Sequence, residues 1–123
     1  MSSKPSSTDF IRDAVIAIKN AIDANPISRD TIQELVPTIH IGRNQLQNTF
    51  KQVSGVAIRR YRLQKRMEVA SQMLSTGEKS VKEVSIKCGY KKQNNFSADF
   101  KLVFKITPAE WMRDQFNDIA FTS

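Results

Sequence analysis

Several kinds of residue and segment are scarce in this chain, and each absence excludes a class of protein. The 123 residues contain one cysteine, Cys88, so no internal disulfide can form, which fits a reducing compartment. The one histidine, His40, has no second histidine or cysteine near it in the sequence, so we expect no metal site. The longest apolar run, Ala14 to Ile18, is far shorter than the ~18 residues of a membrane span, so no membrane partner is expected.

Sequence patterns of catalysis and of export are also missing. The chain has no Gly-rich phosphate loop, no paired catalytic carboxylates and no triad-like set, so we predict a non-enzyme without a cofactor. Residues 1–8 are polar and lack the apolar stretch of a signal peptide, which favours a cytoplasmic location. No alternating strand pattern, small-molecule pocket or dimer seam can be recognised, so we expect no small-molecule ligand in this domain.

Acidic residues are scarce in one long segment. From Arg43 to Lys105 there are fourteen Lys and Arg residues against four acids, a net charge of +10. The rest of the chain carries five Lys and Arg residues and eight acids, a net charge of −3. Scattered lysines are ordinarily a solvated surface, but a basic segment of this size also favours binding to phosphate groups.

The same basic segment contains an internal repeat. Leu-x-x-x-Phe-Lys at residues 46–51 recurs as Phe-x-x-x-Phe-Lys at residues 96–101, fifty positions later. Each copy follows a short apolar helical segment, 32–36 or 81–85, and what reads as a tight turn. A helix, a tight turn and a second helix with exposed polar residues form a helix-turn-helix, whose second helix enters the DNA major groove. Two in tandem are a stronger signal than one.

Helical periodicity and cap signals predict an all-α fold of about seven helices. The first is expected over 9–24, ended by Asn25-Pro26, and the second is expected to be capped by Ser28 and to end near Pro37. A capping box is predicted at Ser80, with Glu83 three residues later. The other helices are expected over 43–53, 58–75 and 93–104, with a short last one after Thr107-Pro108 that carries Trp111.

These helices predict two helix-turn-helix subdomains joined by a linker helix. The expected organisation is a disordered leader (1–8), a first helix-turn-helix subdomain (9–57), a linker helix (58–76), a second helix-turn-helix subdomain (77–115) and a C-terminal tail (116–123).

Three motifs in the second half carry a family resemblance. They are Ser-Val-x-Glu-Val-Ser-x-Lys-Cys-Gly-Tyr at 80–90, Phe-Ser-x-x-Phe-Lys at 96–101 and Thr-Pro-x-Glu-Trp at 107–111. Over about residues 9–113 the chain resembles the DNA-binding domain of AraC/XylS-family bacterial transcription regulators. The first half matches at fewer positions: Leu35, Leu46, Gln47, Phe50, Lys51 and Gly55.

The spacing of the aromatic residues predicts which helix faces are exposed. Leu46 with Phe50, and Phe96 with Phe100, stand four residues apart and form inward stripes, so the positions between them face outward. Asn and Gln can pair with the adenine edge, and Arg and Lys with guanine or phosphate. By resemblance, the DNA base contacts are Asn44, Gln47, Asn48, Gln93, Asn94, Asn95 and Ser97. The expected phosphate contacts are Arg43, Lys51, Arg59, Lys91, Lys92 and Lys101.

Departures from the family pattern fall mostly in the first subdomain. Pro37 stands where the family continues its helix, and His40 replaces the usual turn glycine, where a positive φ is expected. Gly42 and Lys92 stand where a serine usually caps the recognition helix. In the second subdomain Lys105 replaces a glycine.

The favoured function is sequence-specific binding of double-stranded promoter DNA, with two recognition helices in adjacent major-groove segments. The resemblance implies regulation of bacterial transcription, most often activation, with RNA polymerase as a protein partner. The alternative is a helical protein–protein adaptor that kept the fold but lost base readout, its basic segment binding an acidic protein or a membrane surface. A preference for particular base pairs would separate the two.

Overall fold

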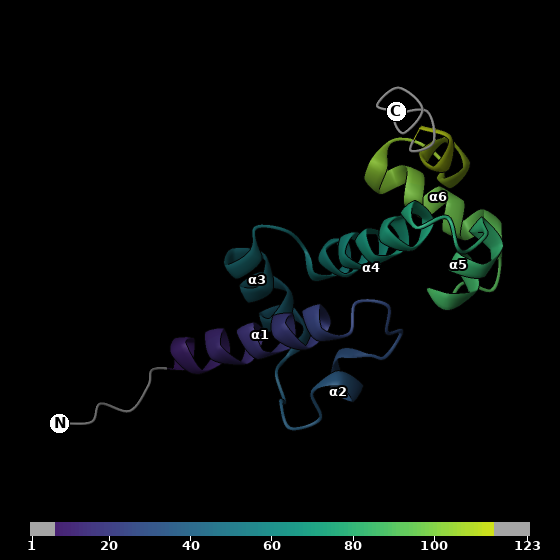
Figure 1. Cartoon of the computed structure of the whole chain (residues 1–123). Coiled ribbons are helices and arrows are strands. Elements are labelled where there is room, and N and C mark those ends of the chain that lie inside the picture. The colour runs from purple at the N-terminus through teal and green to yellow at the C-terminus, as the bar shows by residue number, and fades with distance from the viewer. Residues whose placement is uncertain (1–6, 115–123) are drawn as a thin grey trace. The chain divides into compact units, whose positions relative to one another are not determined.

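The described part of the chain is helical and contains no strand, as the sequence predicted. The computed structural model describes residues 7–114. None of the described helices combines the length and the apolar character needed to cross a membrane. Figure 1 shows α1 (Ser7–Ala24), α2 (Ile32–Leu35), α3 (Arg43–Ser54), α4 (Ile58–Ser75), α5 (Val81–Lys87) and α6 (Gln93–Phe104), which a last helix over 108–114 follows.

The chain divides into two compact units within α4. The first unit ends at Arg62 and the second begins at Leu63. The first turn of α4 therefore belongs with α1, α2 and α3, and the rest of α4 belongs with α5, α6 and the last helix.

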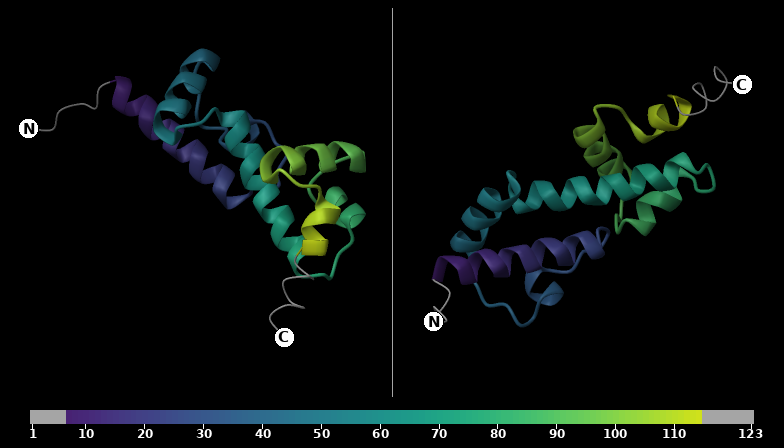
Figure 2. Two further views of the ribbon diagram at one scale, coloured as in Figure 1. Left: turned by 90° about the horizontal axis from the view of Figure 1, so that it is seen from above. Right: turned by 60° about the vertical axis from the view of Figure 1, so that its left-hand side comes forward.

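The first unit is built on α1, against which both α2 and α3 pack (Figure 2). Val15, Ile18 and Ile22 of α1 and Phe50 of α3 form its core, each with at most 1% of its surface exposed. The ring of Tyr61, at the start of α4, meets Phe50 edge-on with centroids 5.4 Å apart, and its hydroxyl donates to the carboxylate of Asp23. α4 is thereby tied to α1 as well as to α3.

The second unit buries a larger and more aromatic core. Val84 and Cys88, from α5 and its C-terminal end, are fully buried beside α6. Phe100 of α6 contacts Phe96, Phe104 and Trp111, with ring centroids 4.8–5.9 Å apart. The remaining fully buried side chains from α4 and α6 are Met67, Ala70, Leu74 and Phe96.

Several predicted helix ends are confirmed by their hydrogen bonds. The Ser80 hydroxyl accepts from the Glu83 amide at 3.1 Å while the Glu83 carboxylate accepts from the Ser80 amide, which completes the capping box. Thr107 caps the last helix by accepting from the Glu110 amide at 3.2 Å. The prediction of a glycine cap is also correct, since Gly55 lies in the left-handed region with φ 83° and donates to the Lys51 carbonyl.

The start of α1 and the cap of α2 differ from the predictions. α1 begins at Ser7, inside the predicted leader, because Asp9 in the first turn favours the helix before the apolar positions start. Residues 1–6 and the predicted tail, 116–123, lie outside the described residues. Thr31, and not Ser28, caps α2 by accepting from the Glu34 amide at 3.2 Å. Ser28 accepts from the Asp30 amide and closes a local turn before the helix.

Candidate nucleic-acid interface

The first recognition helix, α3, presents its polar face to solvent. Leu46 packs half-buried against the first core and Phe50 is fully buried, which confirms the predicted inward stripe. The residues predicted to contact DNA from this helix are all exposed: Arg43, Asn44, Gln47, Asn48 and Lys51. α3 can therefore lie in a groove without losing its contacts with α1.

The second recognition helix, α6, repeats this arrangement. Phe96 and Phe100 are fully buried, and the predicted base-contacting amides Gln93, Asn94 and Asn95 are exposed. Ser97 is half-buried, so it is the least accessible of the predicted contacts on this helix. The three amides occupy the first turn of α6, the part of a recognition helix that ordinarily reaches the base edges.

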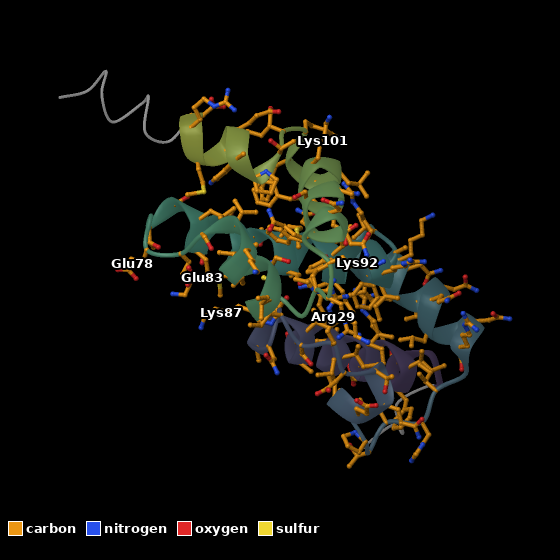
Figure 3. All side chains as sticks on the ribbon, turned by 90° about the vertical axis from the view of Figure 1, so that its right-hand side faces the viewer. Arg29, Glu78, Glu83, Lys87, Lys92 and Lys101 are labelled. Atoms are coloured by element: carbon orange, nitrogen blue, oxygen red, sulfur yellow. The ribbon has the colours of Figure 1, made fainter. Side chains whose placement is uncertain are left out.

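Basic side chains stand at both ends of α6. Lys92 is the N-cap residue and Lys101 lies in the last turn, and Figure 3 shows both projecting from the ends of the helix. The neighbouring helix α5 carries charges of both signs on its exposed face, including Glu83 and Lys87 (Figure 3). The basic side chains at the two ends of α6 suit a phosphate backbone better than the mixed face of α5.

The predicted phosphate contacts are available for binding. Lys51, Arg59 and Lys91 are exposed, as are Arg43, Lys92 and Lys101. Lys19 pairs with Asp23 and Lys65 with Glu68, and neither ion pair includes one of these six. Because these cations have no carboxylate partner in the described part of the chain, contact with DNA would not first break an internal ion pair.

The connection before α3 is longer than the sequence analysis assumed. Residues 36–42 join α2 to α3, whereas residues 88–92 join α5 to α6. The expectation of a tight turn in the first unit is therefore wrong. So is the expectation of a positive φ at His40, since Lys105 is the sole non-glycine residue with a positive φ in the part of the chain that the structure describes. A seven-residue connection can reverse the chain gradually, so it needs no left-handed residue.

An open hollow accompanies this longer connection. It has a volume of about 540 Å³ and lies between α1, α2 and α3. Its apolar lining includes Ile18, Ile39 and Leu46, and His40 and Arg43 also line it. The loop thus holds α2 away from α3, and α2 contributes no buried residue. Helix α1 provides the main support for α3 instead.

A polar cluster lies beneath α6 in the second unit, and the sequence analysis missed it. The Tyr90 hydroxyl donates to the Asp99 carboxylate at 2.6 Å. The same hydroxyl interacts with the side chain of Arg66 of α4, which is 8% exposed. No single motif could have shown that residues 66, 90 and 99 meet, because they come from three elements.

Burial raises the pKa of the Tyr90 hydroxyl above its ordinary value of 10.0, and the hydrogen bond to Asp99 and the negative charge of Asp99 raise it further. The positive charge of Arg66 acts in the opposite direction. The folded state therefore favours the protonated, neutral Tyr90 hydroxyl. The stability that this group contributes is fully present below the unfolded-state pKa of 10.0, and it is lost as the pH rises through the folded-state pKa. The hydroxyl is therefore protonated, and able to donate to Asp99, at neutral pH.

Comparison with known proteins decides the family. A sequence model of the helix-turn-helix domain family matches residues 35–114, which is more than half of the chain. The chain belongs to the AraC/XylS family of DNA-binding transcription regulators. The AraC/XylS family and the chain's relatives are regulators and not enzymes, as the sequence predicted.

Individual relatives agree with the AraC/XylS assignment. A probable transcriptional regulator LumQ from Photobacterium leiognathi is 25% identical, with 79% of this chain and 39% of the relative covered. The transposon Tn10 TetD protein from Escherichia coli is 27% identical, with 88% of this chain and 75% of the relative covered. The chain thus spans well under half the length of LumQ but most of the length of TetD.

A solved structure gives the same fold. The AraC-type transcriptional regulator from Chromobacterium violaceum superimposes with a TM-score of 0.72 at 25% identity, covering 85% of this chain and 93% of that chain. Membership of the AraC/XylS family, whose members are DNA-binding transcription regulators, therefore rests on sequence and fold together.

Proposed function

We propose that this chain binds double-stranded promoter DNA by placing α3 and α6 in two adjacent major-groove segments. The observation that carries the proposal is the repetition of one arrangement in both units. Phe50 and Phe100 are fully buried at equivalent positions, and exposed amides lie on the outward face of each helix. Amides at groove-facing positions can pair with base edges, which simple solvation of a helix surface does not require.

The roles of the side chains follow from their exposure and chemistry. Base pairs are read by Asn44, Gln47 and Asn48 from α3, and by Gln93, Asn94, Asn95 and Ser97 from α6. The phosphates are bound by Arg43, Lys51, Arg59, Lys91, Lys92 and Lys101. These cations position the protein, while the amides supply the sequence preference.

We further propose that the bound protein activates bacterial transcription from the cytoplasm by contacting RNA polymerase. Activation is the mode that the family resemblance implies. In vitro transcription from a promoter carrying the preferred site should increase when the protein is added. Repression from the same template would reverse the sign of regulation and leave the DNA-binding proposal intact.

The test of DNA recognition is selection of bound duplexes from a random pool. We expect an asymmetric motif with two boxes about one helical turn apart, roughly 10 base pairs. A motif with one box would mean that one of the two units binds phosphates without reading base pairs. Binding without any motif, which disappears as salt rises, would contradict base readout and favour another acidic partner for the basic segment.

A further inference from the structure

Three polar side chains from different elements meet beneath α6. Arg66 comes from α4, Tyr90 from the connection after α5, and Asp99 from α6. The Tyr90 hydroxyl donates to Asp99 at 2.6 Å and also interacts with the Arg66 side chain. Within residues 7–114, Arg66 and Asp99 form no direct ion pair, since the pairs there join other residues. One hydroxyl therefore connects a nearly buried cation to a carboxylate.

Arg66 depends on this connection. Its Nε is buried and has no hydrogen-bond partner among the described residues, so its guanidinium is already incompletely satisfied. The Tyr90 hydroxyl gives its one proton to Asp99, and its oxygen interacts with the Arg66 side chain. Removing that hydroxyl would leave both charged groups without this shared partner.

The position of Asp99 links the cluster to the proposed DNA-reading surface. Asp99 stands four residues after Asn95, so the two lie on one side of α6 a single turn apart. Phe96 and Phe100 anchor the helix through apolar contacts, which have no directional preference. The hydrogen bond from Tyr90 has a preferred direction and so restricts the rotation of α6 about its own axis.

We propose that Tyr90, held by Arg66, is a positioning residue that sets the orientation of α6 and thereby the base preference of the second box. The inference rests on the proposed function, because it assumes that α6 reads base pairs. Phenylalanine has the ring of tyrosine without its hydroxyl. Tyr90→Phe therefore preserves a ring that the fold accommodates and removes the bond alone.

The chain offers a matched control in its first unit. The Tyr61 hydroxyl also donates to a carboxylate, that of Asp23, but this bond joins α4 to α1 and includes no residue of a recognition helix. Tyr61→Phe thus removes a tyrosine–aspartate hydrogen bond and keeps the ring that packs against Phe50 of α3. A merely structural contribution of such a bond should appear in both variants as a lower melting temperature.

The experiment measures the dissociation constants of wild type, Tyr90→Phe and Tyr61→Phe for the selected duplex and for a scrambled duplex, at one salt concentration. All measurements are made well below each variant's melting temperature, which is determined separately. We expect Tyr90→Phe to weaken binding to the selected duplex roughly tenfold, the discrimination carried by one good amide–base pair, with scrambled binding unchanged. Tyr61→Phe should leave the ratio of the two constants unchanged.

Repeating the selection locates the effect. With Tyr90→Phe the second box should lose information while the first box stays as in wild type. Asp99→Asn retains an oxygen that accepts from Tyr90, so it should keep more of the discrimination than Asp99→Ala. Combining Asp99→Ala with Tyr90→Phe should reduce the discrimination no further than either change alone, because both remove the same bond.

If Tyr90→Phe leaves the ratio of the two dissociation constants unchanged, the proposal is overturned. It is also overturned if Tyr61→Phe loses as much discrimination as Tyr90→Phe, or if Tyr90→Phe weakens binding to both duplexes equally. If Tyr90→Phe fails to fold, the comparison of Asp99→Asn with Asp99→Ala decides the question, and equal discrimination by those two would also overturn it. If wild type itself prefers neither duplex, the proposed function fails, and this inference fails with it. Preference in wild type with no change in Tyr90→Phe refutes the inference alone.

Discussion

The two helix-turn-helix units share a plan for the recognition helix but differ in what supports it. In the second unit α5 has seven residues, a complete capping box and buried side chains, and it packs directly against α6. In the first unit α2 has four residues, none of them buried, and a seven-residue connection follows it. There, α3 packs mainly on α1. A recognition helix can therefore be presented in the same way by different supporting helices.

The ends of the two recognition helices show a second difference. Both end in a left-handed residue whose amide donates at 2.8 Å to the carbonyl four residues earlier. In α3 this residue is Gly55, with φ 83°, and in α6 it is Lys105, with φ 70°. The hydrogen bonds are the same, but only the lysine has a side chain that disfavours the conformation.

Removing the central aromatic ring of each unit should have the largest effect. Phe50→Ala and Phe100→Ala each empty a fully buried site, so we expect each to lower the free energy of unfolding by about 3–5 kcal/mol. The single tryptophan, Trp111, lies against Phe100, so its fluorescence reports the second unit, whereas circular dichroism reports all helices. Urea titrations followed by both signals would separate the two units.

The two units can be distinguished if the circular dichroism and Trp111 fluorescence midpoints differ. Phe50→Ala should shift the circular dichroism midpoint more than the Trp111 midpoint, and Phe100→Ala should shift the Trp111 midpoint strongly. If Phe50→Ala shifts both midpoints equally, the units unfold as one body, and the separation within α4 has no energetic counterpart.

Exchanging the left-handed cap residues should have an intermediate effect of opposite sign. Gly55→Lys places a side chain in a left-handed conformation and should cost about 1 kcal/mol. No atom lies within 4 Å of the added Cβ, so the cost is conformational and not steric. Lys105→Gly should gain up to about 1 kcal/mol, reduced by loss of the bond from the Lys105 ammonium to the Leu102 carbonyl. Urea midpoints that move in the same direction for both variants would contradict this account.

Adding an N-cap to α3 should have the smallest effect. Gly42 has extended backbone angles, makes no side-chain cap and has open space where a Cβ would be. Gly42→Ser should therefore raise the free energy of unfolding by a few tenths of a kcal/mol, about 0.5 kcal/mol at most, because the hydroxyl can accept from a free amide. Thermal unfolding beside Gly42→Ala tests this, since alanine adds the Cβ without the acceptor. Equal stability of the two variants would show that no cap forms.

The sequence predicted the features that depend on local patterns. The bounds of α4 and α6 agree with the structure, because apolar spacing marks both helices, although α6 ends at Lys105 and not at a glycine. The predicted cap at Ser28 was wrong although serine and threonine can both cap a helix, because Glu34 stands three residues after Thr31, where a capping box places it. The joining of Tyr90 to Asp99 and Arg66 could not be predicted, because contacts between three elements depend on tertiary packing.

The exposure of the predicted DNA contacts also follows from local sequence pattern. Helical spacing was sufficient to place the amides of α3 and α6 on exposed faces, as the structure has them. Their pairing with particular bases remains a prediction, since it depends on how each helix enters its groove. The length of the connection before α3 was also beyond reach, because apolar Ile39 and Ile41 within it resemble helix positions.

The most direct test of tandem groove reading is to repeat the duplex selection with Gln47→Ala and with Gln93→Ala. Both glutamines are exposed, one on α3 and the other at the start of α6. The account predicts that each variant blurs one box of the motif and leaves the other box unchanged. If Gln47→Ala leaves the whole motif intact, or if both variants blur the same box, the two helices do not read neighbouring groove segments.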